Sequence, residues 1–265
     1  MLSYLHAFHA GNHADILKHL TLFTVLRYFN EKGKPYSYFD THAGSGLYPL
    51  NSSYAQKNQE FKTGIEPLLQ APHRPKLLED FCQALQSALP KEHYWGSPYL
   101  ALKVAQADTK LRLFEQHPTV LQELQRHIRA TPPRRLKIMA QDGHQGLVAS
   151  LPPEPRRAVI LIDPSYEQKQ EYQQVLNTLK EATKRFETGC YLLWYPLLQR
   201  PEPLQMLDRL KRTFLNHTHL ELKVREPHED FGMHGSGMFI INPPYTLVSE
   251  MAESMVFLSE LLREH

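Results

Sequence analysis

Residues 38–46 read Tyr-Phe-Asp-Thr-His-Ala-Gly-Ser-Gly, a short apolar run that ends in an acid and a Gly-x-Gly turn. Residues 159–166 read Val-Ile-Leu-Ile-Asp-Pro-Ser-Tyr, a second apolar run that ends in Asp-Pro-x-Tyr. Short apolar runs bounded by turn residues are typical of buried strands. In an open α/β sheet, ligands bind beyond the carboxyl ends of such strands. We therefore expect both polar turns to lie at one binding site.

Strands and helices alternate along most of the chain around these two segments. Apolar periodicity predicts helices at residues 13–30, 98–107, 118–130, 143–151, 169–187 and 201–214. Strands are predicted at residues 36–40, 110–114, 136–140, 157–162, 189–195, 219–224 and 238–241. This alternation is typical of an α/β fold with a doubly wound, mostly parallel sheet. The last two strands are joined by turn residues only, so we expect them to be antiparallel neighbours.

Residues 47–96 interrupt the alternation. They carry no strand of comparable strength, and prolines separate helical patterns at 57–70 and 76–89. We expect a small helical subdomain inserted into a single domain that spans residues 1–265.

Composition narrows the class of protein. A hydrophobic fraction of 42% and a charged fraction of 22% are ordinary for a soluble globular chain of 265 residues. No apolar run is long enough for a transmembrane helix. Cys82 and Cys190 form no Cys-x-x-Cys motif, which favours a reduced, cytoplasmic setting over a thiolate zinc site.

The net charge of +2 does not by itself indicate a nucleic-acid partner. The basic residues include four adjacent pairs: Arg134-Arg135, Arg156-Arg157, Lys184-Arg185 and Lys211-Arg212. They fit solvated loops and helix ends, or a face that follows a phosphate backbone. Only their arrangement in space distinguishes the two.

The glycine turn after the first strand predicts a nucleoside cofactor. Gly44 and Gly46 allow the backbone to approach a ligand closely. A dinucleotide fingerprint needs a third glycine where this chain has Pro49, so NAD is disfavoured. The loop is typical instead of the glycine turn of methyltransferases.

Acidic residues at the next strand ends support a nucleoside. Glu115 follows the second strand, and we predict that it binds the ribose hydroxyls. Asp142 and Gly143 follow the third strand, where a carboxylate and a backbone N–H suit an adenine ring.

Asp163, Pro164 and Tyr166 offer the parts needed to methylate an amino group on a flat ring. Such an amine is a poor nucleophile, because its lone pair is delocalised into the ring. The carboxylate of Asp163 and the carbonyl of Pro164 are placed to accept its two N–H groups, while Tyr166 stacks on the base. The rate then comes from positioning and fixed dipoles. The sequence predicts methyl transfer from S-adenosylmethionine to a nucleobase nitrogen.

A rival motif, Asn-Pro-Pro-Tyr at residues 242–245, matches the pattern [Asp/Asn]-Pro-Pro-[Tyr/Phe] more literally. It ends an outer strand, whereas Asp163 ends the fourth strand, beside the first. We therefore assign the chemistry to Asp163 and predict a structural turn at residues 242–245.

The N-terminal segment is rich in histidine. Three histidines are spaced three and four residues apart: His6, His9 and His13. This spacing can bind a metal on a helix, but methyl transfer needs none, and we expect no metal. We expect Tyr4, His6, Lys18 and His19 to meet over the active site, where aromatic and imidazole rings contact an extruded base. Lys18 would reach a phosphate or the cofactor carboxylate.

Seven blocks resemble the RlmJ-type 23S ribosomal RNA adenine-N6 methyltransferases: residues 1–19, 40–44, 96–98, 115–118, 161–166, 193–196 and 236–244. The resemblance covers nearly the whole chain in one order. It implies a Rossmann-like class I methyltransferase fold with a small inserted helical subdomain. It also implies S-adenosylmethionine-dependent N6-methylation of an adenine in 23S ribosomal RNA, before the ribosome is fully assembled. We expect a monomer.

The resemblance also assigns residues. It implies that Asp163 is the catalytic acceptor, and that Tyr4 faces the RNA with His6 nearby. The cofactor contacts that it implies are Lys18, His19, His42, Ser97, Glu115, Asp142 and Gly143. One departure is Ser165, where the family has proline. Serine frees a backbone N–H and relaxes φ, so the rigidity of this loop is open.

Two other functions fit the same residues. A protein glutamine or a small amine presents a similar N–H pair to Asp-Pro-x-Tyr. Ser165 also fits a catalytically decayed RNA-binding module.

Overall fold

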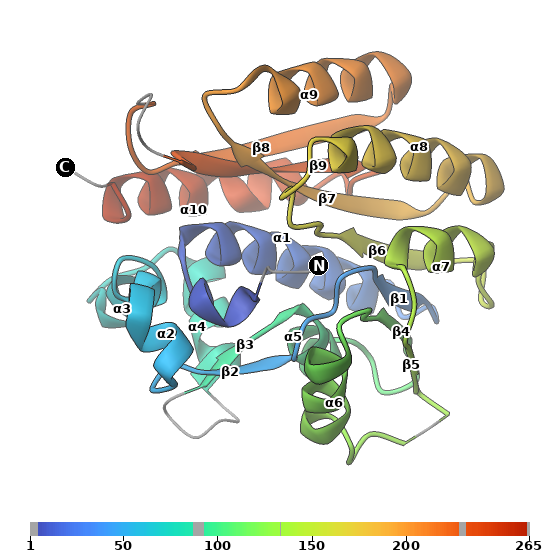
Figure 1. Ribbon diagram of the computed structural model, residues 1–265, viewed down its shortest axis with the longest axis horizontal. Helices are drawn as coiled ribbons and strands as arrows, with labels where there is room; N and C mark the ends of the chain where they lie inside the picture. Colours follow the sequence, from blue (N-terminus) through green and yellow to red (C-terminus); the bar gives the residue numbers. More distant parts are fainter. Residues whose placement is uncertain (1–4, 87–92, 133, 228–231, 264–265) are drawn as a thin grey trace.

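The main sheet brings the two decisive segments side by side. The computed structural model describes residues 5–86, 93–132, 134–227 and 232–263. Seven strands lie in the order β5-β4-β1-β6-β7-β9-β8 (Figure 1). Their bounds are Ser37–Asp40 (β1), Lys110–Phe114 (β4), Leu136–Met139 (β5), Ala158–Ile162 (β6), Cys190–Leu197 (β7), His217–Lys223 (β8) and Gly235–Ile241 (β9). β9 runs antiparallel to both of its neighbours, β7 and β8, and the other neighbouring pairs of this sheet are parallel. The predicted doubly wound, mostly parallel sheet is confirmed, and its switch point lies between β1 and β6.

Helices cover both faces of this sheet (Figure 1). Their bounds are His13–Glu31 (α1), Ser97–Val104 (α5), Pro118–His127 (α6), Gly143–Ala149 (α7), Gln170–Arg185 (α8), Pro201–Thr213 (α9) and Leu247–Leu261 (α10). Along β6, Val159 and Leu161 join the core under α1, α5 and α10, whereas Ile160 and Ile162 join the core under α7, α8 and α9. The predicted helices and strands of this part agree closely with the structure. α10 was not predicted.

Residues 47–96 differ from the expectation of helices alone. β2 (Leu47–Pro49) and β3 (His93–Trp95) form a two-stranded antiparallel sheet. The helices between them are α2 (Ser53–Asn58), the 3-10 helix η2 (Glu60–Lys62), α3 (Ile65–Gln70) and α4 (Lys76–Gln86). The helical pieces predicted around residues 57–70 correspond to the end of α2, to η2 and to α3, which are separate short helices. The chain adopts a left-handed conformation at Gln59, and Gly64 packs so closely on the carbonyl of Gly11 that a side chain there would clash.

α1 is buried on nearly every side. Every residue from His13 to Leu26 is buried, because the helix contacts β9, α5, α10 and α4. The charged residues Asp15 and Lys18 therefore lie inside the protein, where charges need partners. A short 3-10 helix, η1 (His6–Phe8), precedes α1.

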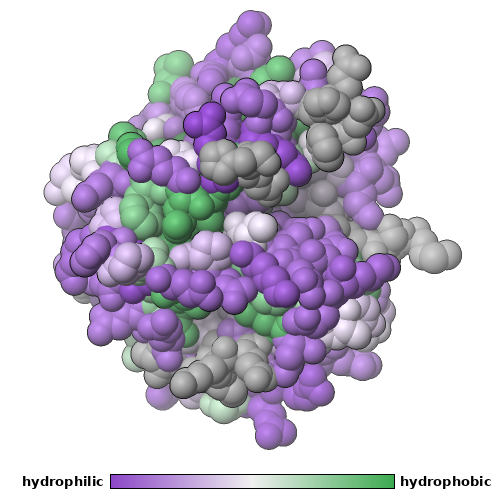
Figure 2. All heavy atoms as spheres, turned by 90° about the vertical axis from the view of Figure 1, so that its left-hand side faces the viewer, coloured by the Kyte–Doolittle hydropathy of each residue, from purple (hydrophilic) through white to green (hydrophobic). Residues whose placement is uncertain are grey.

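The surface is largely hydrophilic. On the face that carries α2 and α3, apolar side chains show only in small groups (Figure 2). None of the helices in the described ranges is long and apolar enough to span a membrane.

Candidate active site

A cavity of about 790 Å³ lies at the carboxyl ends of β1, β4, β5 and β6. A volume of this order is typical of small-molecule and cofactor sites. The predicted site residues that the structure describes all line it: His6, Lys18, His19, His42, Gly44, Ser97, Glu115, Asp142, Gly143, Asp163, Pro164 and Tyr166. The predicted RNA contact Tyr4 lies outside the described residues. The structure thus brings together residues spread over most of the chain.

The glycine turn and Glu115 are joined directly. Gly44 has φ +63°, and a Cβ there would clash with the hydroxyl of Tyr48. The N–H of Gly44 donates to Oε2 of Glu115 at 2.9 Å, and the N–H of His117 donates to Oε1 at 2.8 Å. Burial raises the pKa of Glu115, which these backbone donors oppose. Its carboxylate is therefore held at the rim between β1 and β4, where hydroxyl donors of a ligand would meet it.

Ser97 is held by the end of the first strand. Its hydroxyl donates to Oδ2 of Asp40 at 2.7 Å, and the hydroxyl of Tyr38 donates to the same atom at 2.8 Å. Asp40 is fully buried, and burial raises its pKa to about 6. The sequence indicated that Asp40 ends a strand, but it did not identify Tyr38 as a hydrogen-bond partner of Asp40. Side chains alternate along a strand, so residues 38 and 40 lie on one face of it.

Asp142 and Gly143 shape the turn after β5. One carboxylate oxygen of Asp142 accepts the N–H of Gln145 at 2.8 Å and caps α7. A Cβ on Gly143 would overlap the carbonyl of Thr41. Glycine is therefore required for the turn after β5 to lie against the turn after β1.

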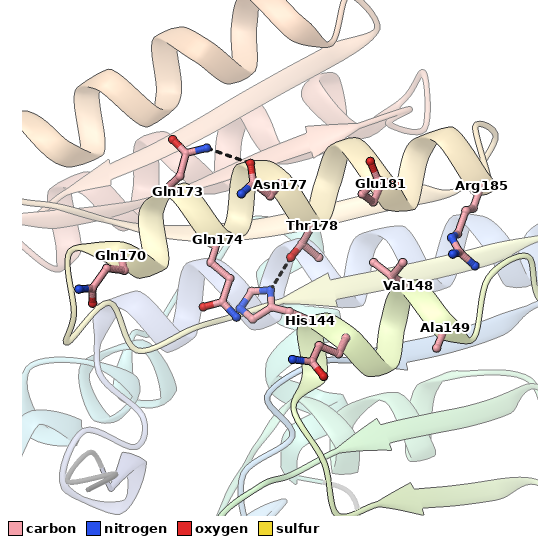
Figure 3. A pocket seen from close by; sticks show the side chains of 11 residues that line it. His144, Val148, Ala149, Gln170, Gln173, Gln174, Asn177, Thr178, Glu181 and Arg185 are labelled. Atoms are coloured by element: carbon pink, nitrogen blue, oxygen red, sulfur yellow. Dashed lines mark hydrogen bonds between the residues drawn. The ribbon is translucent and has the colours of Figure 1, made fainter.

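Two neutral histidines, His42 after β1 and His144 on α7, lie together at one side of the cavity. The rings of His42 and His144 meet edge-on at 5.1 Å, and burial lowers the pKa of His42 to about 3. Nδ1 of His144 lies 3.0 Å from Oγ1 of Thr178 on α8 (Figure 3). His144, which was not predicted as a site residue, also lines a groove of about 660 Å³ between α7 and α8, and none of the predicted site residues lines that groove. His144 thus separates the cavity from the outer groove.

Lys18 bridges two carboxylates. Its Nζ lies 2.6 Å from Oδ2 of Asp163 and 2.9 Å from Oδ1 of Asp15. Burial lowers the pKa of Lys18, but the two carboxylates outweigh it, so the pKa lies well above its ordinary value. A permanent cation therefore faces Asp163. Sequence reasoning missed Asp15; its signal was the spacing Asp-x-x-Lys inside an otherwise apolar helix.

The Asp-Pro-Ser-Tyr loop is anchored from two elements. Tyr166 has φ +54°, is buried, and donates its hydroxyl to the carbonyl of Trp194 on β7 at 3.0 Å. The hydroxyl of Ser165 donates to Glu171 on α8 at 3.4 Å. The serine that replaces the second proline thus gives the loop a link to α8. The hydroxyl of Tyr166 is thus engaged with Trp194, and its ring lies 4.5 Å from that of Tyr172.

His19 lines the cavity, and one of its two ring nitrogens, 4.0 Å from Oδ1 of Asp15, has no hydrogen bond within the described part of the chain. Its Nδ1 lies 2.7 Å from the hydroxyl of Tyr94, whereas its buried Nε2 has no hydrogen-bond partner among the residues described. Burial lowers the pKa of His19 to about 3, so the ring is neutral. A buried polar atom without a partner fits a site that a polar cofactor completes.

His6 and His9 have separate protein partners. Nδ1 of His9 lies 2.7 Å from Glu60 of η2, and Nε2 of His6 lies 2.9 Å from Asp15. Across the ranges that the structure describes, no cluster of metal-ligating side chains was found.

The rival motif lies at the opposite edge of the sheet. Because β9 is antiparallel, Ile241 pairs with Tyr191 near the start of β7, and Asn242 follows there. The side-chain amide of Asn242 donates to the carbonyls of Glu187 and Gly189 at 2.7 and 2.8 Å. Residues 242–245 therefore form a structural turn away from the cavity, as predicted.

The basic pairs also lie away from the cavity, because each precedes a strand that runs parallel to β1. Arg135 donates to the carbonyls of Leu102 and Ala105 at the end of α5. Arg157 donates to the carbonyls of Phe29 and Lys34 at the end of α1. For these two arginines, the structure favours helix ends over a phosphate-tracking face.

Comparison with known proteins gives the family. The family model RsmJ, described as "Ribosomal RNA large subunit methyltransferase D, RlmJ", matches residues 33–265. The protein named ribosomal RNA large subunit methyltransferase J from Escherichia coli strain K12 is 38% identical, over 99% of this chain and 94% of its own length. The chain belongs to the RlmJ family. The same-named protein from Haemophilus influenzae is 36% identical over the same shares.

One solved structure is similar to this chain over nearly its whole length. Protein LPL1258 from Legionella pneumophila is similar with a TM-score of 0.86 and 35% identity, covering 96% of this chain and 94% of that one. Membership confirms the resemblance drawn from the sequence. Methyltransferase activity and the Rossmann-like methyltransferase fold follow from it, and it supports S-adenosylmethionine as the cofactor.

Proposed function

We propose that this RlmJ-family chain transfers a methyl group from S-adenosylmethionine to N6 of an adenine in 23S ribosomal RNA. The contact of 2.6 Å between Lys18 and Asp163 at the switch point carries the proposal. The carboxylate of Asp163 faces the ammonium of Lys18 beside a cavity that suits a nucleoside cofactor, which supports the proposal. The two curated relatives act, by their names, on large-subunit ribosomal RNA.

Asp163 is the acceptor of the target amino group in this proposal. The ammonium of Lys18 lies against the carboxylate, and the carbonyl of Pro164 follows directly as a second acceptor. When both N–H groups of the amine are held, its lone pair points out of the ring toward the methyl group. The cofactor supplies that methyl group in electrophilic form, on a sulfonium. Fixed acceptors of this kind cost no reorganisation during the reaction.

Residues on three strand ends would hold the cofactor. Glu115 suits the ribose hydroxyls, since its carboxylate is fixed by two backbone donors. Asp142 and the N–H groups at the start of α7 suit the adenine ring. His19 offers its unpartnered Nε2 to a polar group. The predicted contacts of His42, Gly44 and Ser97 belong to the same wall of the cavity.

The RNA would enter past the inserted subdomain, which we place at residues 47–96. Tyr54 of α2 lines the cavity and is 48% exposed, and its ring meets Phe8 edge-on at 5.1 Å. Nζ of Lys57 lies 5.5 Å from the Phe8 ring. An exposed aromatic beside a cation suits the stacking of an unpaired base. We propose that a monomer binds RNA here before ribosome assembly is complete.

The test is in vitro methylation of protein-free 23S ribosomal RNA, followed by nucleoside mass spectrometry. Wild-type protein should form N6-methyladenine only when S-adenosylmethionine is present. Asp163→Asn should lose roughly 10²-fold or more in kcat, because one fixed acceptor is removed, while calorimetry shows unchanged cofactor binding. Asp208→Asn, which changes an exposed acid on α9, is the matched control.

Each other candidate has its own outcome in this experiment. A decayed RNA-binding module binds RNA but neither binds the cofactor nor forms product. A protein or small-amine methyltransferase binds the cofactor but leaves the RNA unmodified. Full activity of Asp163→Asn would show that another residue accepts the target amino group.

A further inference from the structure

Asp15 lies where three parts of the active site meet. Its side chain is 1% exposed. Oδ2 accepts the N–H of Gly11 and contacts Nε2 of His6, both at 2.9 Å. Oδ1 lies 2.9 Å from Nζ of Lys18. One carboxylate thus joins the N-terminal segment, α1 and the lysine that faces Asp163.

We propose that Asp15 is a positioning residue for methyl transfer, which holds the ammonium of Lys18 against Asp163. The inference rests on the proposed role of Asp163 as acceptor. Asp15 also lines the cavity, but its side chain is 1% exposed and its two carboxylate oxygens are engaged by Gly11, His6 and Lys18, so we expect it to act through Lys18. Asp163, whose side chain is 15% exposed, lines the cavity.

Charge balance requires this carboxylate. Asp15, Lys18 and Asp163 form a row in which one cation lies between two anions. Lys18 is 5% exposed, so its ammonium has little water around it. A buried charge that loses its partner is strongly disfavoured. With Asp163 as its only carboxylate, Lys18 would give up its proton more readily, and Asp163 would lose the cation beside it.

The backbone fixes where Asp15 points. Asn12 caps α1 and accepts the N–H of Asp15 at 2.9 Å, while Gly11 donates to the carboxylate. Asp15 and Lys18 are three residues apart, so both lie on one face of the helix. Lysine is long and flexible. A carboxylate anchored at a helix start restricts its ammonium to one place, and small displacements in an active site are costly to the rate.

Several titratable groups surround this row. They are His6 from η1 and His9 after it, His13 and His19 from α1, Tyr38 and Asp40 from β1 and His42 after it, Tyr48 from β2, Tyr94 from β3 and Tyr166 after β6. Burial raises the pKa of Asp15, but His6, Lys18 and His19 outweigh it and hold the pKa well below its ordinary value. Asp15 therefore stays anionic where Lys18 needs it.

The experiment compares Asp15→Asn, Asp15→Glu and Asp80→Asn in the full-length protein. Asparagine keeps the size and an acceptor but removes the charge, whereas glutamate restores the charge. Asp80 is the matched control, because it also pairs with two cations, Arg27 and Lys76, away from the cavity. The readouts are kcat and KM on 23S RNA, cofactor affinity, and the titration of the Lys18 ammonium by NMR of ¹⁵N-lysine-labelled protein. Lys18→Arg assigns that signal.

Asp15→Asn should lower kcat roughly 10²-fold while cofactor affinity is kept. Its activity should fall further toward alkaline pH, where the wild type is flat, and its Lys18 signal should titrate at lower pH. Asp15→Glu should recover part of kcat and the wild-type pH profile, and Asp80→Asn should match the wild type.

A wild-type kcat and pH profile in Asp15→Asn would overturn the inference. So would a Lys18 titration that does not move. If Asp15→Asn fails to fold, Asp15→Glu decides: a folded Asp15→Glu protein whose kcat is still roughly 10²-fold below the wild type, with an alkaline loss of activity, contradicts a positioning role. The NMR titration needs no turnover. A wild-type protein that methylates no RNA therefore refutes the proposed function separately, while a moved Lys18 signal still supports the Asp15–Lys18 link.

Discussion

The hydroxyl of Ser97 donates to the buried carboxylate of Asp40 at 2.7 Å, and this hydrogen bond ties the start of α5 to the end of β1. Burial raises the pKa of Asp40 from 3.8 to about 6, and the donors Ser97 and Tyr38 oppose that rise. Because the folded pKa is the higher one, the ionised carboxylate is disfavoured by folding. The stability linked to Asp40 is fully present below a pH of 3.8 and is lost as the pH rises through about 6.

Ser97→Ala should therefore destabilise the protein more at neutral than at acidic pH. Removing the donor raises the pKa of Asp40 further, so the pH-dependent loss grows. We expect the free energy of unfolding to fall by about 1–3 kcal/mol at neutral pH, with a smaller difference at acidic pH. Denaturant titrations at both pH values measure this. Ser249→Ala, at an exposed hydroxyl on α10, is the control; an equal loss at both pH values would contradict the linkage.

Gly143→Ala should distort the turn after β5. Its Cβ would overlap the carbonyl of Thr41, which is backbone and cannot move aside cheaply. We expect a loss of about 1–3 kcal/mol in the free energy of unfolding, as for other overpacked sites, together with weaker cofactor binding. Thermal unfolding and calorimetry check the two effects. Gly232→Ala has open space around its Cβ and should change neither. Unchanged stability in Gly143→Ala would show that the two turns have room to separate.

Asn242→Ala should reduce stability but not chemistry. The variant loses side-chain hydrogen bonds to Glu187, Gly189 and Asn216 at a position with φ +52°. We expect the free energy of unfolding to fall by about 1–3 kcal/mol, with unchanged kcat on 23S RNA per folded molecule. Asp163→Asn, assayed in parallel, should lose kcat but keep its free energy of unfolding. A strong loss of kcat in Asn242→Ala would show that the Asn-Pro-Pro-Tyr motif takes part in the reaction.

Tyr54→Ala should weaken RNA binding without affecting the cofactor. Stacking of a base on an aromatic ring contributes about 1–3 kcal/mol, so the Kd for RNA should rise roughly tenfold. Filter binding with 23S RNA, and calorimetry with S-adenosylmethionine, separate the two ligands. Tyr54→Trp should keep the affinity. Tyr245→Ala removes a ring that is 80% exposed at the far edge of the sheet, and should have no effect. Equal RNA affinity in Tyr54→Ala would exclude this ring from the interface.

Much of the fold was predictable because its core strands are locally encoded. β6 is an unbroken apolar run and is buried along its whole length. The antiparallel pair β8 and β9 was predicted from the turn-rich segment between them. β2 and β3 have three residues each, too few for a pattern, and they pair across most of the insertion. α10 was overlooked, although Leu247, Met251 and Leu258 recur at helical spacing on its buried face.

The sequence alone determined which residues could reach the cavity. Parallel strands end at one edge, so Gly44, Glu115, Asp142 and Asp163 had to meet once their strands were recognised. Tertiary structure decided the rest. The antiparallel direction of β9 sends Asn242 to the other edge. The burial of α1 brings Lys18 to Asp163, a contact between residues 145 positions apart. Such pairings depend on strand order and helix packing, which no local pattern of residues encodes.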